Sequence, residues 1–164
     1  MTNLTFSLDM DKLTHDQPVE HTADGWPTRD LIIIGAGPAG LTAGVYGGRA
    51  QLNPLILVGQ AFGGQAATTN DMENYPGFPD GINGYTLTEQ MSTQAQRFGT
   101  EIAYEQVLTL NLSTYPFEVH TYGGGYYARS LILCTGASPR HLEVPGEAQL
   151  IGRGVSFCAT SDGF

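Results

Sequence analysis

Short apolar runs that end at glycines are the most regular feature of this chain. The run Leu31–Ile34 has four consecutive apolar residues, which are too few for a helix. It ends at Gly35, and two similar runs, Pro54–Val58 and Ser130–Ala137, also lead into glycines. Strands that are buried on both faces have this nearly continuous apolar pattern. The three runs therefore predict three strands of a parallel sheet.

Helical spacing occupies two of the intervals between these runs. Leu41–Arg49 continues from the first strand and its glycines with helical spacing. From Tyr85 to Phe98, apolar residues recur at positions i, i+4, i+8 and i+11, as on one face of an amphipathic helix. Gly99 follows at the place where glycine commonly ends a helix. The pattern therefore predicts two helices.

Alternating residues predict a smaller, antiparallel part of the fold. Ile102–Leu110 alternates as one strand. Phe117–Thr121 and Tyr126–Ala128 then flank Gly123–Gly125, which is typical of a hairpin. Together with the runs and helices above, this predicts the α/β class. We expect a Rossmann-like domain with a parallel sheet plus a small antiparallel β-meander.

The first strand leads into the motif Gly35-x-Gly37-x-x-Gly40. In a strand–turn–helix unit, the first glycine allows a sharp turn, the second lets a pyrophosphate approach the backbone, and the third allows close helix packing. The helix N-terminus presents unpaired N–H groups to the phosphates, and Pro38 suits the first turn because it has no N–H. A glycine-rich turn alone would also produce this motif. The strand before it and the helix after it favour dinucleotide binding.

The second strand lacks the acid that usually holds a ribose in such folds, about 20 residues past the glycines. Gly59 and Gln60 occupy this place, and the next acid is Asp71, which disfavours a plain NAD-dependent dehydrogenase. Ala61–Asn70 and Asn74–Gly81 are rich in turn-forming residues and together form a loop of about twenty residues. Loops of this length usually carry function, although a surface excursion is the alternative.

Composition limits the classes of partner and compartment. The 164 residues carry 16 acids against 7 bases, a net charge of −9, which argues against nucleic acid and anionic membranes as partners. The N-terminus lacks the basic and apolar regions of a signal peptide, and no apolar run is long enough to span a membrane, so we expect a cytoplasmic protein. Residues 1–29 are polar and predict an N-terminal arm in which His15 and His21 are exposed. Leu4, Phe6 and Leu8 alternate with polar residues, so a short strand that docks on a partner surface stays open as the alternative. No metal site is expected.

The two cysteines, Cys134 and Cys158, are too few for a disulfide scaffold. Cys134 lies within the third predicted strand, which indicates a small buried hydrophobic residue rather than a reactive thiol. His141 belongs to the turn-rich stretch Pro139–Gly146, where we expect it to cap or to be solvated rather than to catalyse.

The end of the chain, Gly152–Phe164, carries the most specific pattern, GRGVSFCATSDGF. With four further motifs it resembles the thioredoxin reductase family, and the motifs occur in that family's order. These motifs are Gly35–Gly40, Gly63–Gln65, Glu73–Gly77 and Thr135–Ser138. The resemblance covers Asp30 to Phe164, so we divide the chain into the arm, residues 1–29, and an FAD-binding domain, residues 30–164.

This resemblance implies a two-domain FAD enzyme that passes a hydride from NADPH, or NADH, to the flavin. The flavin then reduces a Cys-x-x-Cys pair, which in turn reduces thioredoxin or a similar small disulfide. It also implies a homodimer. The FAD-binding residues that it implies form a pyrophosphate turn, a flavin loop with one residue beside it, a backbone contact to adenine and a second glycine turn. They are Gly35, Gly37, Pro38, Ala39 and Gly40; Gly63, Gly64, Gln65 and Asn74; Val107; and Thr135 and Gly136.

One departure from the family concerns its active-site pattern Cys-Ala-Thr-Cys, which here reads Cys158-Ala-Thr-Ser161. The candidate catalytic residues are Cys158, Ser161 and Asp162. A Cys–Ser pair cannot close an intramolecular disulfide, because a hydroxyl is not redox-active. Cys158 can still attack a partner's disulfide, but no second thiol would resolve the mixed disulfide. An engineered substitution and a natural variant with other chemistry both stay open.

A second departure is length, because the family's nicotinamide domain and a final segment of its FAD domain follow beyond the position of Phe164. We therefore expect an incomplete FAD-binding domain that does not bind NADPH by itself. Three functions stay open. The first is a thioredoxin-reductase-like disulfide oxidoreductase. The second is a flavin reductase of the same fold without a dithiol, such as a ferredoxin–NADP reductase, and the third is a non-enzymatic flavin-binding redox sensor.

Overall fold

The computed structural model describes residues 25–158 and contains two four-stranded sheets. The first sheet is wholly parallel, with Ile33 of its central strand opposite Ile56 on one side and Ile132 on the other. Its strands, in spatial order, are β4 (Glu101–Ala103), β3 (Leu55–Leu57), β2 (Ile32–Ile34) and β8 (Leu131–Leu133). The three apolar runs thus form neighbouring parallel strands, as predicted.

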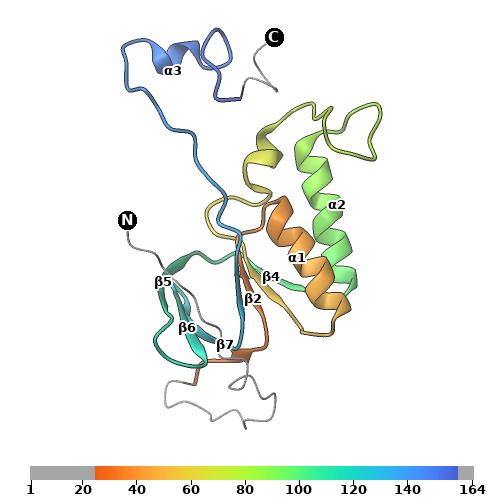
Figure 1. The fold of residues 1–164 in the computed structure, drawn as a ribbon, viewed down its shortest axis with the longest axis vertical. Helices are drawn as coiled ribbons and strands as arrows, with labels where there is room; N and C mark the ends of the chain where they lie inside the picture. Colours follow the sequence, from red (N-terminus) through yellow and green to blue (C-terminus); the bar gives the residue numbers. More distant parts are fainter. Residues whose placement is uncertain (1–24, 159–164) are drawn as a thin grey trace, which may run out of the picture.

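Helices cover one face of this sheet and the second sheet covers the other, as Figure 1 shows. Because side chains alternate along a strand, the buried Ile33 faces one way and its neighbours Ile32 and Ile34 face the other. Ile33 packs in a cluster with Leu41 of the first helix, whereas Ile32 and Ile34 pack with Val119 of the second sheet. The core therefore has two layers of side chains, one on each face of the parallel sheet.

Two helices lie close together because α1 is rich in glycine. They are α1 (Pro38–Arg49) and α2 (Gly84–Arg97). A Cβ on Gly48 would lie 2.6 Å from the carbonyl oxygen of Phe98, at the end of α2. Thr100, just beyond that end, donates a hydrogen bond of 2.8 Å to the carbonyl oxygen of Gly44. Glycine costs helix stability of about 1 kcal/mol relative to alanine, and here the close approach explains its use.

The second sheet contains the predicted hairpin, and Gly124 and Gly125 are part of its second strand. Its strands, in spatial order, are β1 (Thr28–Arg29), β7 (Gly124–Ala128), β6 (Phe117–Thr121) and β5 (Val107–Asn111). The meander β5–β6–β7 is antiparallel, whereas β1 pairs in parallel with β7. Thr28 and Arg29, which the sequence pattern placed in the arm, are thus paired. The arm up to residue 24, with His15 and His21, lies outside the described residues.

The expectation of one strand over Ile102–Leu110 is wrong. Ala103 and Glu105 still accept hydrogen bonds from the end of β3, through Val58 N (2.9 Å) and Gly59 N (3.0 Å). The chain then crosses to the second sheet, where β5 begins at Val107. Alternation continues across the crossing, so the pattern alone does not reveal that the two halves belong to different sheets.

The long loop between β3 and α2 contains one turn of 3-10 helix, η2 (Gly64–Thr68), where the sequence indicated only turns. Farther along, Cys134 follows the end of β8 and is half-buried rather than buried. Burial raises the pKa of its thiol, in keeping with an unreactive residue.

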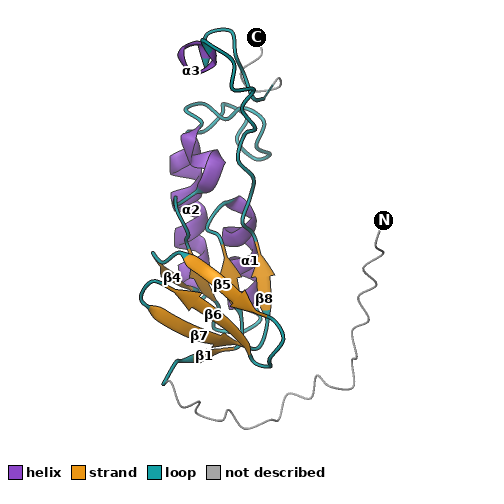
Figure 2. Ribbon diagram, turned by 90° about the vertical axis from the view of Figure 1, so that its left-hand side faces the viewer, coloured by secondary structure: helices purple, strands orange, loops and turns teal. Residues whose placement is uncertain are grey.

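After β8 the chain leaves the layers, and Figures 1 and 2 both place α3 (Glu147–Leu150) away from them. This last described segment is held together by its own contacts, including a parallel bridge between Ile151 and Val155. Within residues 25–158, no helix has the length and apolar character needed to cross a membrane.

Candidate functional site

The turn between β2 and α1 requires glycine at its first position. Gly35 has φ +108°, and a Cβ there would overlap the carbonyl oxygen of Cys134. A Cβ on Gly40 would likewise overlap the carbonyl oxygen of Gly35. The first and third glycines of the motif therefore serve the sharp turn and the close packing of the helix, as the sequence motif predicts.

Gly37 differs from its neighbours because nothing fills the space beside it. A Cβ on Gly37 would have no neighbour closer than the carbonyl oxygen of Gly63, at 4.0 Å. Packing within the chain thus does not demand glycine here, whereas a group that approaches the backbone from outside would. Gly37 is also the N-cap of α1, and no side chain caps the helix. Uncapped N–H groups and the positive end of a helix dipole are suited to binding phosphate.

The flavin loop of the family resemblance lies against this turn. Gly63 donates a backbone hydrogen bond of 3.0 Å to Ala36, and a Cβ on Gly64 would lie 3.5 Å from the Cα of Gly37. Gly63 has φ +76°, and a Cβ on it would come within 2.6 Å of Thr88 Oγ1 on α2. The loop is therefore held between the glycine turn on one side and α2 on the other.

The second glycine turn, Thr135–Gly136, follows β8, which is the other neighbour of β2. Cys134 donates a backbone hydrogen bond of 2.8 Å to Ile34, and Thr135 and Gly136 follow at the same edge of the sheet. Gly136 has φ +68°, a left-handed conformation that glycine adopts without strain, and a Cβ there would have open space beside it. Glycine at this position is therefore explained by the backbone conformation and not by packing. Gly35–Gly40, Gly63–Gly64 and Thr135–Gly136 thus meet at the carboxyl ends of β2 and its neighbours.

This place is where an open α/β sheet binds its ligand. The chain passes from β2 to β3 and β4 on one side and returns to β8 on the other side of β2. Such a reversal of strand order leaves a crevice at the carboxyl ends of the strands. The open backbone at Gly37 and the uncapped N-terminus of α1 lie at this edge of the sheet, so the residues present fit a dinucleotide pyrophosphate.

The other predicted residues belong to several different segments of the fold. Gln65, in η2, and Asn74, in the loop after it, are both exposed, while Val107 is half-buried at the start of β5. The exposed Cys158 lies beyond α3, and Ser156 Oγ accepts a hydrogen bond of 3.0 Å from its backbone N–H. The structure thus brings the glycines together, but it does not show these four residues at the turn. Ser161 and Asp162 are outside the described residues.

The pattern of the sequence did not reveal Glu105, which closes the crossing between the two sheets. Its carboxylate accepts hydrogen bonds of 2.7 Å from Thr121 Oγ1 and of 2.7 Å from the hydroxyl of Tyr126. Burial, together with the hydrogen bond to Glu105 and the charge of this carboxylate, raises the pKa of Tyr126 to about 12. Glu105 therefore joins the end of β3 to the second sheet, because its carbonyl oxygen accepts the Gly59 N–H and its carboxylate binds Thr121 and Tyr126. It stands two residues before Val107, which the resemblance places at the adenine. The one signal in the sequence was that Glu105 is an acidic residue within the alternating stretch Ile102–Leu110.

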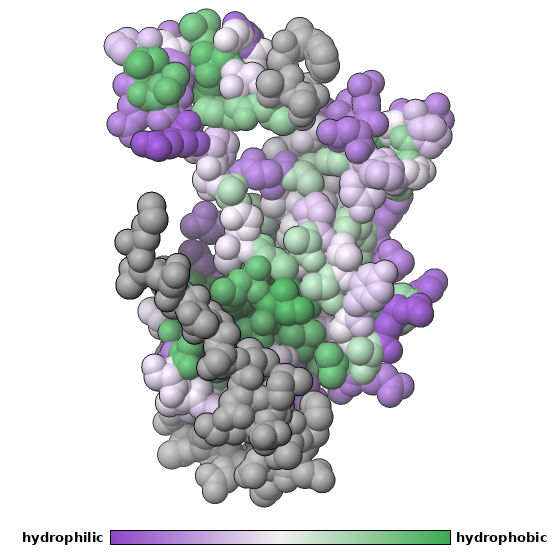
Figure 3. Space-filling model, viewed as in Figure 1, coloured by the Kyte–Doolittle hydropathy of each residue, from purple (hydrophilic) through white to green (hydrophobic). Residues whose placement is uncertain are grey.

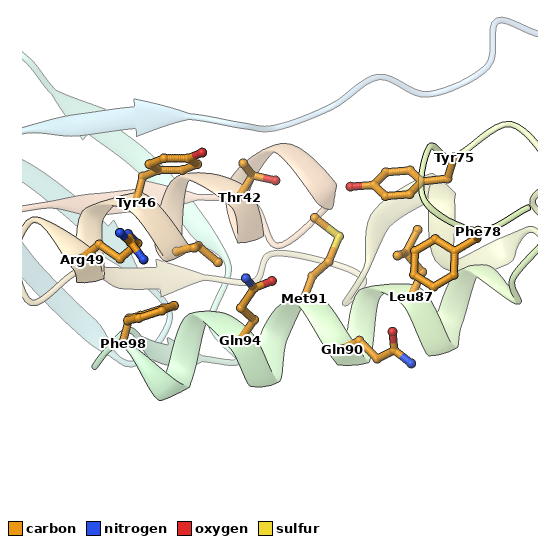
Figure 4. A pocket seen from close by; sticks show the side chains of 11 residues that line it. Thr42, Tyr46, Arg49, Tyr75, Phe78, Leu87, Gln90, Met91, Gln94 and Phe98 are labelled. Atoms are coloured by element: carbon orange, nitrogen blue, oxygen red, sulfur yellow. The ribbon is translucent and has the colours of Figure 1, made fainter.

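A separate groove of about 480 Å³ runs along α1 and α2 under the loop that contains Tyr75 and Phe78. Figure 4 shows Tyr46, Arg49 and Met91 among the side chains around it. No glycine of the dinucleotide turns lines this groove, so we do not assign it to the dinucleotide. Among residues 25–158 there is also no cluster of three or more His, Cys, Asp or Glu side chains that could hold a metal.

Known proteins are similar to this chain in both sequence and fold. It is 48% identical over 134 residues to thioredoxin reductase from Treponema pallidum, which covers 82% of the chain and 44% of that protein. It is 42% identical over 154 residues to NADPH-dependent thioredoxin reductase 3 from Arabidopsis thaliana, which covers 92% of the chain and 29% of that protein. The crystal structure of thioredoxin reductase from Streptococcus pyogenes superimposes with a TM-score of 0.73 at 41% identity, over 83% of this chain and 44% of that one.

The chain thus spans less than half the length of each of these relatives. The family described as pyridine nucleotide-disulphide oxidoreductase matches residues 29–164, which includes both glycine turns and the end of the chain. On this match, and on the geometry of the turns, the chain belongs to the pyridine nucleotide-disulphide oxidoreductase family.

Proposed function

We propose that this chain is the FAD-binding part of a thioredoxin-reductase-like disulfide oxidoreductase. The observation that carries the proposal is the open backbone of Gly37 at the uncapped N-terminus of α1, in a turn against which Gly63 and Thr135 lie. Three glycine segments that meet at the carboxyl edge of a parallel sheet suit a pyrophosphate. The relatives are thioredoxin reductases, which supports FAD over other dinucleotides.

In this proposal the chain's own residues bind and orient the cofactor. The N–H groups at the start of α1 hold the pyrophosphate, and Gly37 lets it approach the backbone. By the family resemblance, Gln65 and Asn74 would lie beside the flavin, and the backbone of Val107 would contact the adenine. Bound FAD would supply a two-electron carrier between a nicotinamide nucleotide and a thiol. NADPH is the expected donor, since one relative is named an NADPH-dependent thioredoxin reductase.

Cys158 is the thiol that we assign to exchange with a partner's disulfide, with Ser161 and Asp162 in the same catalytic segment. The Cys158 thiolate attacks one sulfur of the partner, the partner's S–S bond breaks, and the second partner sulfur leaves as a thiolate. The product is a mixed disulfide. Because residue 161 is serine, no neighbouring thiol is present to resolve it, so this chain is expected to retain its partner. A thioredoxin-type protein or another small disulfide is the proposed partner.

The edge of the parallel sheet supports the proposal that further chain completes this domain in the whole protein. Among the described residues, β8 pairs only with β2, and Ile132 and Leu133 on it are 38% and 59% exposed. Figure 3 shows hydrophobic surface gathered in the middle of this face, where β8 runs. An uncovered apolar edge strand invites pairing with other chains, and soluble proteins normally cover it. We propose that a segment beyond the nicotinamide domain does so, in a homodimeric enzyme.

Ser161 favours a second candidate function, which is a flavin reductase of the same fold that passes electrons to another acceptor without a dithiol. In that case Cys158 would be incidental to the reaction. The two candidates share the FAD site and differ only in the need for a thiol. Cys158→Ala therefore separates them, because it abolishes mixed-disulfide formation and leaves a dithiol-free reduction unchanged.

The test of the proposal is the visible spectrum of the purified protein, followed by reconstitution with FAD. We expect absorption bands of bound flavin, and release of FAD rather than FMN or NAD on heating. A colourless protein that takes up no FAD on reconstitution would overturn the assignment. Reconstitution is part of the test because a partly uncovered domain can lose a weakly held cofactor during purification.

A further inference from the structure

The segment that leads to Cys158 is organised around a carboxylate instead of an apolar core. Between residues 135 and 158, the part of the segment that the structure describes, Glu147 is the only buried side chain, at 5% exposure. Large apolar residues around it are exposed, including Leu142 at 76% and Val144 at 53%. Burying a charge is costly unless it is paired and hydrogen-bonded. The surroundings of Glu147 therefore have to supply its partners.

Three neighbouring groups supply them. Glu147 Oε1 accepts a hydrogen bond of 3.0 Å from the backbone N–H of Leu142, and Oε2 accepts one of 2.7 Å from that of Glu143. His141 Nδ1 lies 3.3 Å from Oε1. The N–H of Leu142, and after it the N–H of Glu143 and the imidazole of His141, lower the pKa of Glu147 against the opposing effect of burial. The carboxylate is thus ionised near neutral pH, and the turn 141–143 is folded around it.

From His141 the contacts continue to the cysteine. Its imidazole ring packs edge-to-face against the ring of Phe157, with ring centroids 5.0 Å apart and an interplanar angle of 76°. Phe157 precedes Cys158 in the chain. Ser156 Oγ accepts a hydrogen bond of 3.0 Å from the backbone N–H of Cys158 and donates one of 3.1 Å to its carbonyl oxygen. A continuous series of contacts therefore runs from Glu147 through His141 and Phe157 to Cys158.

Backbone hydrogen bonds also shape this segment. Backbone hydrogen bonds close the turn from Leu150 to Val155, through Val155 N to Leu150 O (2.9 Å) and Gly152 N to Val155 O (2.9 Å). These bonds shape residues 150–155 but do not connect them to the turn at His141. The Glu147–His141–Phe157 series connects the turn at His141 to the residue before Cys158.

We propose that Glu147 is a positioning residue for Cys158, acting through His141 and Phe157. The inference deepens the proposed function, on which it rests for the role of Cys158 in exchange. Glu147 does not touch the reacting sulfur. Its carboxylate fixes the turn 141–143, and the ring contact then limits the orientations of the cysteine segment.

The experiment measures the motion of Cys158 directly. A nitroxide spin label is attached to Cys158 of the full chain in a Cys134→Ala background, because alanine retains the Cβ that lies beneath Gly40. Glu147→Ala, Glu147→Gln and His141→Ala are compared with the parent by electron paramagnetic resonance. Glu143→Gln is the matched control, since it removes the same charge from the same turn and leaves the Glu147 carboxylate in place.

We expect the rotational correlation time of the label to shorten about twofold or more in Glu147→Ala and in His141→Ala, because local contacts limit motion on the nanosecond scale. Glu147→Gln should restore part of the parent's value, since its carbonyl oxygen can still accept one N–H hydrogen bond. Glu143→Gln should match the parent. The double variant Glu147→Ala/His141→Ala should be no more mobile than either single variant, because both break the same series.

An unchanged spectrum in Glu147→Ala would overturn the inference, and so would equal mobility in Glu143→Gln and Glu147→Ala. Thermal unfolding of the same samples shows whether the layered domain is intact, which we expect because α3 lies away from it. Flavin content, measured on those samples, reports on the proposed function separately. If the protein binds no FAD but the label mobility follows the expected order, the proposed function fails and the positioning role of Glu147 stands.

Discussion

The backbone N–H of Gly63 donates a hydrogen bond of 3.0 Å to the carbonyl oxygen of Ala36. This bond joins the loop after β3 to the turn after β2, so two glycine segments more than twenty residues apart form one surface. The left-handed conformation of Gly63 (φ +76°) and its close approach to Thr88 mean that a larger residue would disturb the loop. The geometry of the dinucleotide turn thus depends on long-range contacts as well as on the local motif.

Gly37→Val should abolish FAD binding while the fold survives. Valine tolerates the extended backbone at Gly37 (φ −77°, ψ −178°), and the space beside it is open, so the side chain would occupy the place of the pyrophosphate. Flavin content after reconstitution measures the effect, and circular dichroism checks the fold. Gly123→Val is the control, because a Cβ there would make only ordinary contacts, at 3.7 Å or more. Equal FAD content in Gly37→Val and the parent would refute the pyrophosphate assignment.

Gly48→Ala should destabilise the domain. Its Cβ would lie 2.6 Å from the carbonyl oxygen of Phe98, and backbone cannot yield as the tip of a side chain can. Because this contact is with backbone, we expect overpacking to cost about 2–3 kcal/mol, which outweighs the roughly 1 kcal/mol gained in helix propensity. The free energy of unfolding should therefore fall by about 1–2 kcal/mol. Thr42→Ala, at an exposed position of the same helix, should change it by no more than about 0.5 kcal/mol. Urea denaturation measures both. A Gly48→Ala protein as stable as the parent would contradict the close packing.

Tyr126 should make stability depend on alkaline pH. Its pKa is raised to about 12 in the folded protein, against 10.0 for an ordinary tyrosine. Between these two values the folded state retains the phenolic proton while the unfolded state loses it. The contribution of Tyr126 to the free energy of unfolding is therefore fully present below pH 10 and is lost as the pH rises towards 12. Urea denaturation at a series of pH values should show a smaller loss over this window in Tyr126→Phe than in the parent. Tyr122→Phe, where the ring is 80% exposed, should behave as the parent. If all three proteins lose the same stability, burial and the contact with Glu105 do not raise the pKa of Tyr126 in the folded protein.

Ser161→Cys should create disulfide turnover in the whole protein, with the nicotinamide domain present. A second thiol would resolve the mixed disulfide at Cys158 and let electrons from the flavin enter a dithiol. We expect NADPH-dependent reduction of thioredoxin or of an aromatic disulfide, compared at equal flavin content. The parent should reduce its flavin normally, turn over disulfides poorly and accumulate a mixed disulfide with thioredoxin. Unchanged turnover after the substitution would favour the dithiol-free reductase.

The sequence by itself determined the strand–glycine–helix unit and the parallel strands. Leu31–Ile34 is too short and too apolar for anything but a buried strand, and Gly35 and Gly40 stand where no Cβ can be accommodated. These features are local, because they depend on backbone sterics and on the burial of adjacent residues. The predicted helices and the hairpin follow from the same kind of pattern, whereas the meeting of the glycine segments depends on contacts such as that between Gly63 and Ala36.

Only the tertiary structure decided what depends on partners distant in the sequence. The stretch Ile102–Leu110 divides between two sheets, because its first part pairs with β3 and its last part pairs with β6. At the crossing, Glu105 accepts a hydrogen bond from Tyr126, 21 residues away. The half-burial of Cys134 and the burial of Glu147 likewise follow from packing that no periodicity records. The sequence does not distinguish a solvated glutamate from one such as Glu147, whose carboxylate accepts two backbone hydrogen bonds. Its role becomes visible only when the folded chain brings its donors within reach.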